Sequence, residues 1–198
     1  MSFVKTTLEL LVAQIATSME VVANKINSWS SVASDTKYPS ESLIKGSFAT
    51  AAETTAGTNA SKLVTASGLA HSDFGKGKIH VKILDDATLL TTGDGKLILC
   101  IQSEFNGYNL VGAQAYVTTP SSSGLPSIGI RNVTDSVEML TVNITINVSG
   151  YTSYAATTPP TIDTAHDDVA TGDLIAVDID TAGTGTKGLG VILNFQLP

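Results

Sequence analysis

The strongest constraint on this chain is the period-two alternation of apolar and polar side chains across residues 76–198. The clearest run places Leu140, Val142, Ile144, Ile146 and Val148 between Thr and Asn residues. Successive side chains of a strand point to opposite faces, so this pattern is typical of antiparallel strands with one buried face. Shorter runs of the same kind lie at 79–83, 97–101, 111–117, 128–130, 175–179 and 189–197.

These runs predict a mainly β fold. Seven or eight strands separated by Gly, Pro, Asn and Asp suit an antiparallel, jelly-roll-like β-sandwich over residues 76–198. Gly93-Asp94-Gly95 predicts a hairpin between Leu89 or Leu90 and Leu97. The glycine-rich residues 183–188 predict a second hairpin between Ile179 and Leu189, because they lack the spacing of a phosphate-binding loop.

Residues 1–35 carry a different, helical period. Their apolar residues recur at alternating steps of three and four, which is a coiled-coil seam. β-branched residues within this seam favour three or more strands over a parallel dimer. We therefore expect an amino-terminal helix that associates with other copies, although a single helix packed on its own domain also fits the pattern. The seam residues are Leu8, Val12, Ile15, Met19, Val22 and Ile26.

Residues 36–75 are expected to form a linker with short helices. One short helix is predicted over residues 41–45, ending at Gly46. Two more are predicted on either side of a turn at Gly57. Such segments bury too little apolar area to fold alone, so they need neighbouring chains or a docking surface.

Charge and hydropathy exclude several classes of partner. The chain carries 11 basic and 18 acidic residues, and Arg131 is its only arginine. Nucleic-acid binding uses an arginine-rich basic face, so we expect no nucleic-acid partner. No apolar run reaches membrane-spanning length, so we expect no membrane partner. A mean hydropathy of +0.21 nevertheless favours apolar surface buried between subunits.

We find no convergent set of catalytic residues and expect neither enzyme activity nor a cofactor. The segment Asp163–Asp168 holds three carboxylates and His166, which suits a Ca²⁺ or transition-metal site or, in the simpler interpretation, a solvated loop. Asp178 and Asp180 share one strand face, where they are expected to keep the outer surface wet. Cys100, the only cysteine, is expected to fill core space.

One polar segment has the composition of a recognition loop. Tyr151 and Tyr154 lie among Ser, Thr, Ala and Pro in residues 151–160. Tyr and Ser are adaptable contact residues at loop tips. We therefore take Tyr151 and Tyr154 as candidate surface-recognition residues, with an ordinary packed loop as the alternative.

The linker also resembles a motif of tailed-bacteriophage fibre proteins. That resemblance covers about 40 residues, and Ala66 stands where the motif has proline. The matching residues are Ala49, Thr50, Glu53, Ala56, Gly57, Thr58, Asn59, Lys62, Val64, Thr65, Leu69 and Ala70.

Residues from Glu104 to Leu189 resemble a β-domain of small phage virion proteins. Its marks include Glu104-Phe105-Asn106-Gly107, Arg131-Asn132-Val133-Thr134 and Gly183-Thr184-Gly185-Thr186. The two resemblances together imply a homotrimeric head fibre or capsid decoration protein on the virion surface. Its amino-terminal region would contact the major capsid protein or another virion protein. The alternative is a short tail fibre or adhesin that contacts the host envelope, with a host surface glycan as a candidate partner.

Overall fold

The computed structural model describes residues 25–26, 38–39, 46–57, 59 and 61–198. The chain divides into two compact units, residues 1–68 and 69–198. Within the described residues, no helix is long and apolar enough to cross a membrane.

The first unit contains two very short strands. β1 (Lys25–Ile26) pairs in parallel with β2 (Tyr38–Pro39). Ile26, predicted as the last seam position of a helix, therefore lies in a strand. The other predicted seam residues, and the helix predicted over 41–45, lie outside the described residues. The seam residues concerned are Leu8, Val12, Ile15, Met19 and Val22.

The two helices predicted around Gly57 are present. α3 (Ala51–Ala56) begins with a capping box, in which the Thr50 hydroxyl accepts from the Glu53 amide and the Glu53 carboxylate accepts from the Thr50 amide. The helix ends at Gly57, whose φ of 62° lies in the left-handed region that glycine adopts at low cost. α4 (Ala66–Ala70) begins at the position where the fibre motif has proline.

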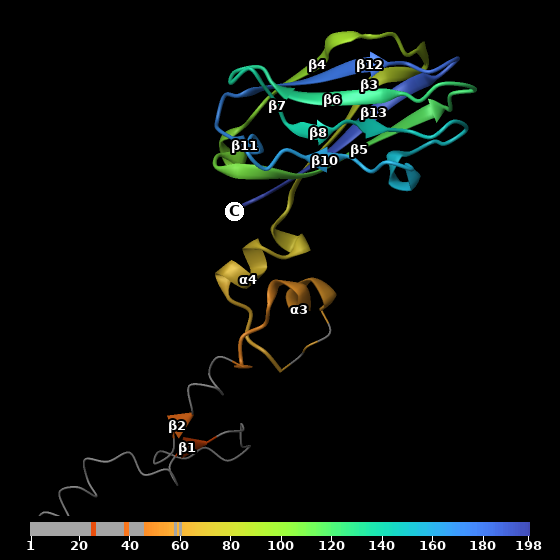
Figure 1. Ribbon diagram of the computed structural model, residues 1–198. Helices are drawn as coiled ribbons and strands as arrows, with labels where there is room; N and C mark the ends of the chain where they lie inside the picture. The colour runs from red at the N-terminus through yellow and green to blue at the C-terminus, as the bar shows by residue number, and fades with distance from the viewer. Residues whose placement is uncertain (1–24, 27–37, 40–45, 58, 60) are drawn as a thin grey trace, which may run out of the picture. The chain divides into compact units, whose positions relative to one another are not determined.

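The second unit is a mainly β, sandwich-like structure of two antiparallel sheets (Figure 1). The first sheet has the order β11-β5-β13-β3 and the second the order β4-β12-β6-β7, with β9 also paired to β6. A separate pair joins β8 to β10. The strands are β3 (Gly77–Leu89), β4 (Gly93–Cys100), β5 (Tyr108–Thr119), β6 (Ser127–Asn132), β7 (Val137–Glu138), β8 (Leu140–Val142), β9 (Ile144–Thr145), β10 (Thr161–Ile162), β11 (Asp168–Val169), β12 (Leu174–Thr181) and β13 (Lys187–Gln196).

The alternation in the sequence creates the core between the sheets. Every second residue of β13 points inward, and Leu189, Val191, Leu193 and Phe195 have no exposed surface. The facing sheet contributes another set to the same cluster, which includes Ile128, Ile130, Ile175, Val177 and Ile179. Burying a side chain of this size contributes about 1.5–3 kcal/mol before conformational entropy is counted. The predicted antiparallel β class is confirmed by this arrangement.

Both predicted hairpins are wrong, because the strands they would join lie in different sheets. β3 pairs with β13 and β4 pairs with β12, so residues 90–92 cross from one sheet to the other, and Gly93-Asp94-Gly95 begins β4 rather than forming a turn. Leu90 is buried in the core, and its amide donates to the Thr186 carbonyl at 2.9 Å. The hydrogen bond and the buried side chain of Leu90 hold the crossing segment against the core. The connection over 182–186 likewise leads from β12 in one sheet to β13 in the other.

Two strand predictions also need correction. The run from Leu140 to Val148 is divided into β8, which pairs with β10, and β9, which pairs with β6. Asn143 lies between them and donates a hydrogen bond to Asp180 instead of continuing one ladder. Val111 is exposed rather than buried, because a register shift in β5 places Leu110 in the core.

The sandwich has two distinct ends, which we call the base and the far end. At the base, β3 begins opposite the end of β13, with Gly77 facing Phe195; at the far end, Leu89 faces Lys187. The Gln196 side chain donates to the carbonyls of Ala70 and Ser72 at 2.9 and 2.8 Å, which ties the segment before β3 to the base. These contacts explain why the unit begins at Leu69 rather than at the predicted residue 76.

Candidate functional site

The far end is built from loops that hold one another in place. The amide of Ser122 donates to the Thr184 carbonyl at 3.0 Å, and the amide of Thr184 donates to the Ser123 carbonyl at 2.8 Å. The Ser121 hydroxyl accepts from the Thr184 amide at 3.0 Å and donates to carbonyls of its own loop. A third loop joins them, because the Ser149 amide donates to the Ser121 carbonyl at 2.9 Å.

Beside these loops, Ser153 fastens the segment 151–155 to the free edge of β5. Its hydroxyl accepts from the Ala115 amide at 2.9 Å and donates to the Gln114 side chain. The Val117 amide donates to the Tyr151 carbonyl at 2.9 Å. The segment, which includes a 3-10 turn over Ser153–Ala155, therefore satisfies backbone donors that an uncovered edge would expose.

Asn147 holds the same segment from its other side. Its Nδ2 donates to the Ala155 carbonyl at 2.8 Å, and its Oδ1 accepts from the amide and hydroxyl of Thr157 at 3.1 and 3.2 Å. The Thr145 hydroxyl donates to the Thr158 carbonyl at 3.2 Å. The loop is thus fixed at several points by buried or half-buried polar groups.

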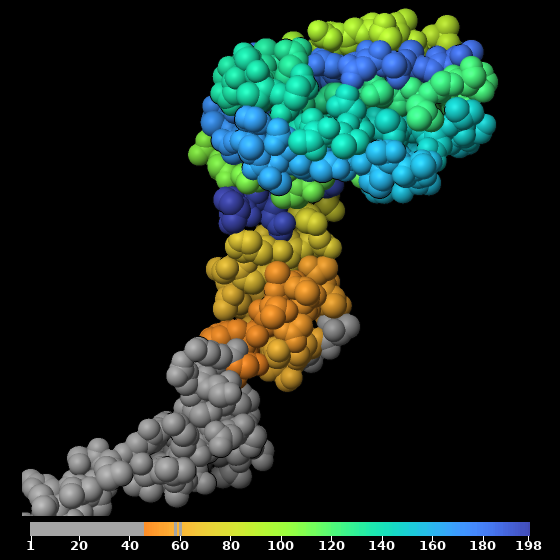
Figure 2. Space-filling model, viewed as in Figure 1, coloured from red at the N-terminus to blue at the C-terminus, as the bar shows by residue number. Residues whose placement is uncertain are grey.

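The two candidate tyrosines project from this fixed loop into solvent. Tyr151 is 57% exposed and Tyr154 is 70% exposed, whereas Ser153 between them is buried. In Figure 2 the loop forms part of the surface at the lower right of the sandwich, in light blue. The chain has no Asp, Glu, Lys, Arg or His in residues 105–130, 139–162 or 181–186, which supply all of the far-end loops described above. These three segments are therefore uncharged and rich in hydroxyl groups, and the charged far-end residues Asp94, Lys96 and Lys187 lie outside them.

The segment Asp163–Asp168 forms an internally bonded loop. His166 Nδ1 lies 2.8 Å from Asp163 Oδ2, and this hydrogen bond, together with that from the Ala165 amide, lowers the pKa of Asp163. Burial raises the pKa of Asp167. Within the described part of the chain, no group of three or more His, Cys, Asp or Glu side chains is arranged to hold a metal ion.

Asp178 and Asp180 have different environments. Asp178 is only 5% exposed, accepts a hydrogen bond from Arg131 Nε at 3.0 Å and accepts another from the Gly95 amide. The prediction that Asp178 is a solvated residue of the outer face is therefore wrong. Asp178 is buried and forms an ion pair with the half-buried Arg131, which raises the pKa of Arg131. Asp180 is exposed. Burial, and then the charge of Asp178, raise the pKa of nearby Glu138.

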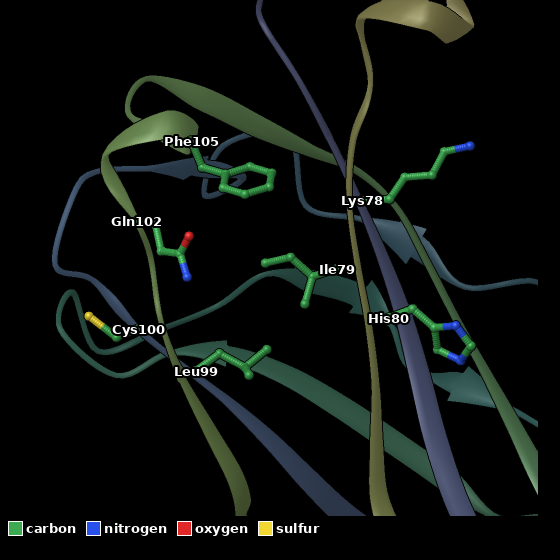
Figure 3. Close-up of a pocket in the computed structure, with 7 residues that line it drawn as sticks. All are labelled: Lys78, Ile79, His80, Leu99, Cys100, Gln102 and Phe105. Carbon is green, nitrogen blue, oxygen red and sulfur yellow. The ribbon is translucent and has the colours of Figure 1, made fainter.

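A pocket of about 360 Å³ lies between β3 and β4, each at the edge of its sheet. In Figure 3, Ile79 and Leu99 point into the space between the strands, whereas Lys78 and His80 point away. The remaining lining residues are Cys100, Gln102 and Phe105. None of the seven is a carboxylate that could pair with His80, and His80 Nε2 instead lies 3.3 Å from the Tyr116 hydroxyl.

Cys100 does not fill the core as predicted. It faces outward on β4, where it is exposed and opposite Leu174 of β12. Its position at the end of the run 97–101 follows the alternation, in which Leu97, Leu99 and Ile101 are the inward residues.

The chain matches no protein family, no curated protein and no solved structure. The functional proposal below therefore depends on the contacts and the exposure of the described residues. Sequence reasoning identified Tyr151 and Tyr154 but missed Ser153 and Asn147, whose partners lie 38 and between eight and ten residues away. No local sequence signal distinguishes Ser153 or Asn147 from the other Ser and Asn residues of the chain.

Proposed function

We propose that this protein is a structural component of a bacteriophage virion, a homotrimeric head fibre or capsid decoration protein displayed on the particle surface. In this proposal residues 1–75 bind other copies and a capsid or other virion protein, and the sandwich is displayed. The assignment to a bacteriophage particle depends on the resemblances to phage fibre proteins and small virion proteins.

The proposal depends most on the difference between the two ends of the sandwich: the chain enters and leaves the sandwich at the base. The segment before β3 and the last residues of the chain meet at the base, where His71 Nε2 lies 3.0 Å from the carbonyl of Pro198. In this proposal the sandwich is attached through the segment that enters its base, and the far end is the displayed surface. β13 runs between the two ends with 10 residues, so the far end projects roughly 30 Å from the base at about 3.3 Å per residue.

The strand order supports a jelly roll as the finer description of the fold. Along the chain, β3, β4, β5 and β6 alternate between the two sheets, and β12 and β13 again lie in opposite sheets. Double-sheet jelly rolls are used by viral capsid and lectin domains, which is an argument by analogy of fold.

Immunogold labelling of intact particles tests the proposal. Antibodies raised against the full-length chain are expected to label the outside of particles of the virus that encodes it. Labelling that appears only after the particles are broken would contradict surface display. Labelling confined to the tail would favour the alternative, a short tail fibre or adhesin, which the exposed tyrosines of the far end support.

A further inference from the structure

The far end combines three properties that point to a ligand class. Its loops are fixed before any ligand arrives, residues 139–162 carry no charged side chain, and the rings of Tyr151 and Tyr154 within them are exposed to solvent. Preorganised contact residues lose little conformational entropy on binding, which raises affinity for a given contact area.

From these properties we infer that the far end binds an uncharged glycan, with Tyr151 and Tyr154 as its stacking surfaces. A tyrosine ring offers an apolar face and a hydroxyl at its edge. A neutral sugar offers the matching groups, because its ring carries both C–H faces and hydroxyls. Thr152 and Thr158 are exposed in the same segment, and their hydroxyls offer further donors and acceptors.

A neutral glycan fits this surface better than a charged polymer or a protein partner. Anionic polymers are recognised through Arg and Lys, which residues 139–162 lack entirely. Protein interfaces are enriched in Tyr, Trp, Phe, Met and Arg, which gather around a contiguous apolar centre. Here the tyrosines are set among Thr, Ala and Ser, and the segment 146–160 contains neither Arg nor Met.

Ser153 and Asn147 act as positioning residues for the two rings. Ser153 fixes the backbone between Tyr151 and Tyr154 by binding the β5 edge, and Asn147 fixes the backbone after Tyr154. Neither side chain has to touch the glycan. Their role predicts that loosening the loop weakens binding while the tyrosines remain exposed.

An array of neutral and anionic bacterial surface polysaccharides, probed with labelled full-length protein, tests the inference. We expect binding to neutral polysaccharides, and a loss of about tenfold in affinity for Y151A and for Y154A, as is typical for an aromatic anchor. The matched control is F74A, because Phe74 is also 70% exposed but lies near the base. This variant is expected to bind as the unaltered chain does.

The other outcomes overturn the inference. They are binding to none of the neutral polysaccharides, equal binding by the tyrosine variants, preference for anionic polysaccharides, or binding to host envelope that survives periodate cleavage of its sugars but not protease. The inference rests on the proposed display of the far end, and light scattering on the same samples separates the two. A monomer that binds neutral glycan contradicts the trimer alone, whereas a trimer that binds none contradicts the glycan alone.

Discussion

The backbone amide of Ala115 donates a hydrogen bond of 2.9 Å to the hydroxyl of Ser153, 38 residues later in the chain. This bond joins the part of β5 that β11 does not pair with to the loop that presents Tyr151 and Tyr154. Because the loop covers the β5 edge, the exposed rings belong to a fixed part of the sandwich. Hydrogen exchange of the Ala115 amide therefore reports whether the loop stays bound to β5.

Replacing Ser153 by alanine should loosen the loop without unfolding the sandwich. Hydrogen exchange of the Ala115 amide is expected to accelerate about tenfold, since a lost hydrogen bond is worth about 1–1.5 kcal/mol. The amide of Leu110, which donates to the Asp167 carbonyl at 2.7 Å nearer the base, serves as the internal control. Unchanged exchange at Ala115 would mean that Ser153 does not anchor the loop.

The far-end loops should tolerate a side chain at Gly185 better than at Gly183. Both glycines have positive φ, of 72° and 66°, so alanine strains the backbone at either position. At Gly183 a Cβ would also lie 2.4 Å from the Ser121 hydroxyl oxygen, whereas nothing lies within 4 Å at Gly185. Thermal unfolding should show Gly183→Ala less stable than Gly185→Ala by about 1–2 kcal/mol. Equal stabilities would argue against the close contact with Ser121.

Removing the guanidinium of Arg131 should destabilise the sandwich far more than removing an exposed cation. Arg131→Met leaves the buried Asp178 carboxylate without its charged partner, at a cost of about 2–3 kcal/mol in the free energy of unfolding. Lys82→Met breaks an exposed ion pair with Asp86, and its effect on the free energy of unfolding should be much smaller, because water screens an exposed pair. Chemical denaturation of both variants compares them directly, and similar losses would refute a buried role for Asp178.

The linker contact between Glu53 and Lys62 should weaken in acid. The Lys62 ammonium, 2.8 Å away, followed by the Thr50 amide, lowers the pKa of Glu53 from its ordinary 4.5 to about 2. A depressed carboxyl pKa stabilises the folded state above pH 4.5, and that contribution is lost as the pH falls toward 2. An NMR titration of the Glu53 carboxyl carbon should show this midpoint, and Lys62→Met should return the pKa toward 4.5. A midpoint near 4.5 in the unaltered chain would contradict the contact.

The sequence predicted the strands well because burial along a strand is local information. Alternation alone identified Ile128, Ile130, Ile175 and Ile179 as inward residues, and they are buried. Strand partners depend on distant residues: the anchoring of Leu90 beside Thr186 sends β4 to the other sheet, against the hairpin predicted from its glycines.

Local pattern failed in a second way wherever the backbone departs from regular geometry. The register shift in β5 turns Val111 outward, and no side-chain pattern distinguishes it from Ala113. At the candidate site, too, the exposed residues could be predicted from the sequence but the contact that anchors them could not. Composition was enough to single out Tyr151 and Tyr154, but the anchor at Ser153 depends on a contact that no local pattern encodes.

We propose that copies of this chain associate through their amino-terminal region and display the sandwich. The most direct test is the mass of the full-length protein in solution, measured by light scattering at micromolar concentration. We predict a particle of three times the chain mass of 20.5 kDa, reduced to single chains by Ile15→Asp with the β circular dichroism unchanged. A mass of 20.5 kDa for the unaltered chain, or an intact trimer in the variant, would contradict the account.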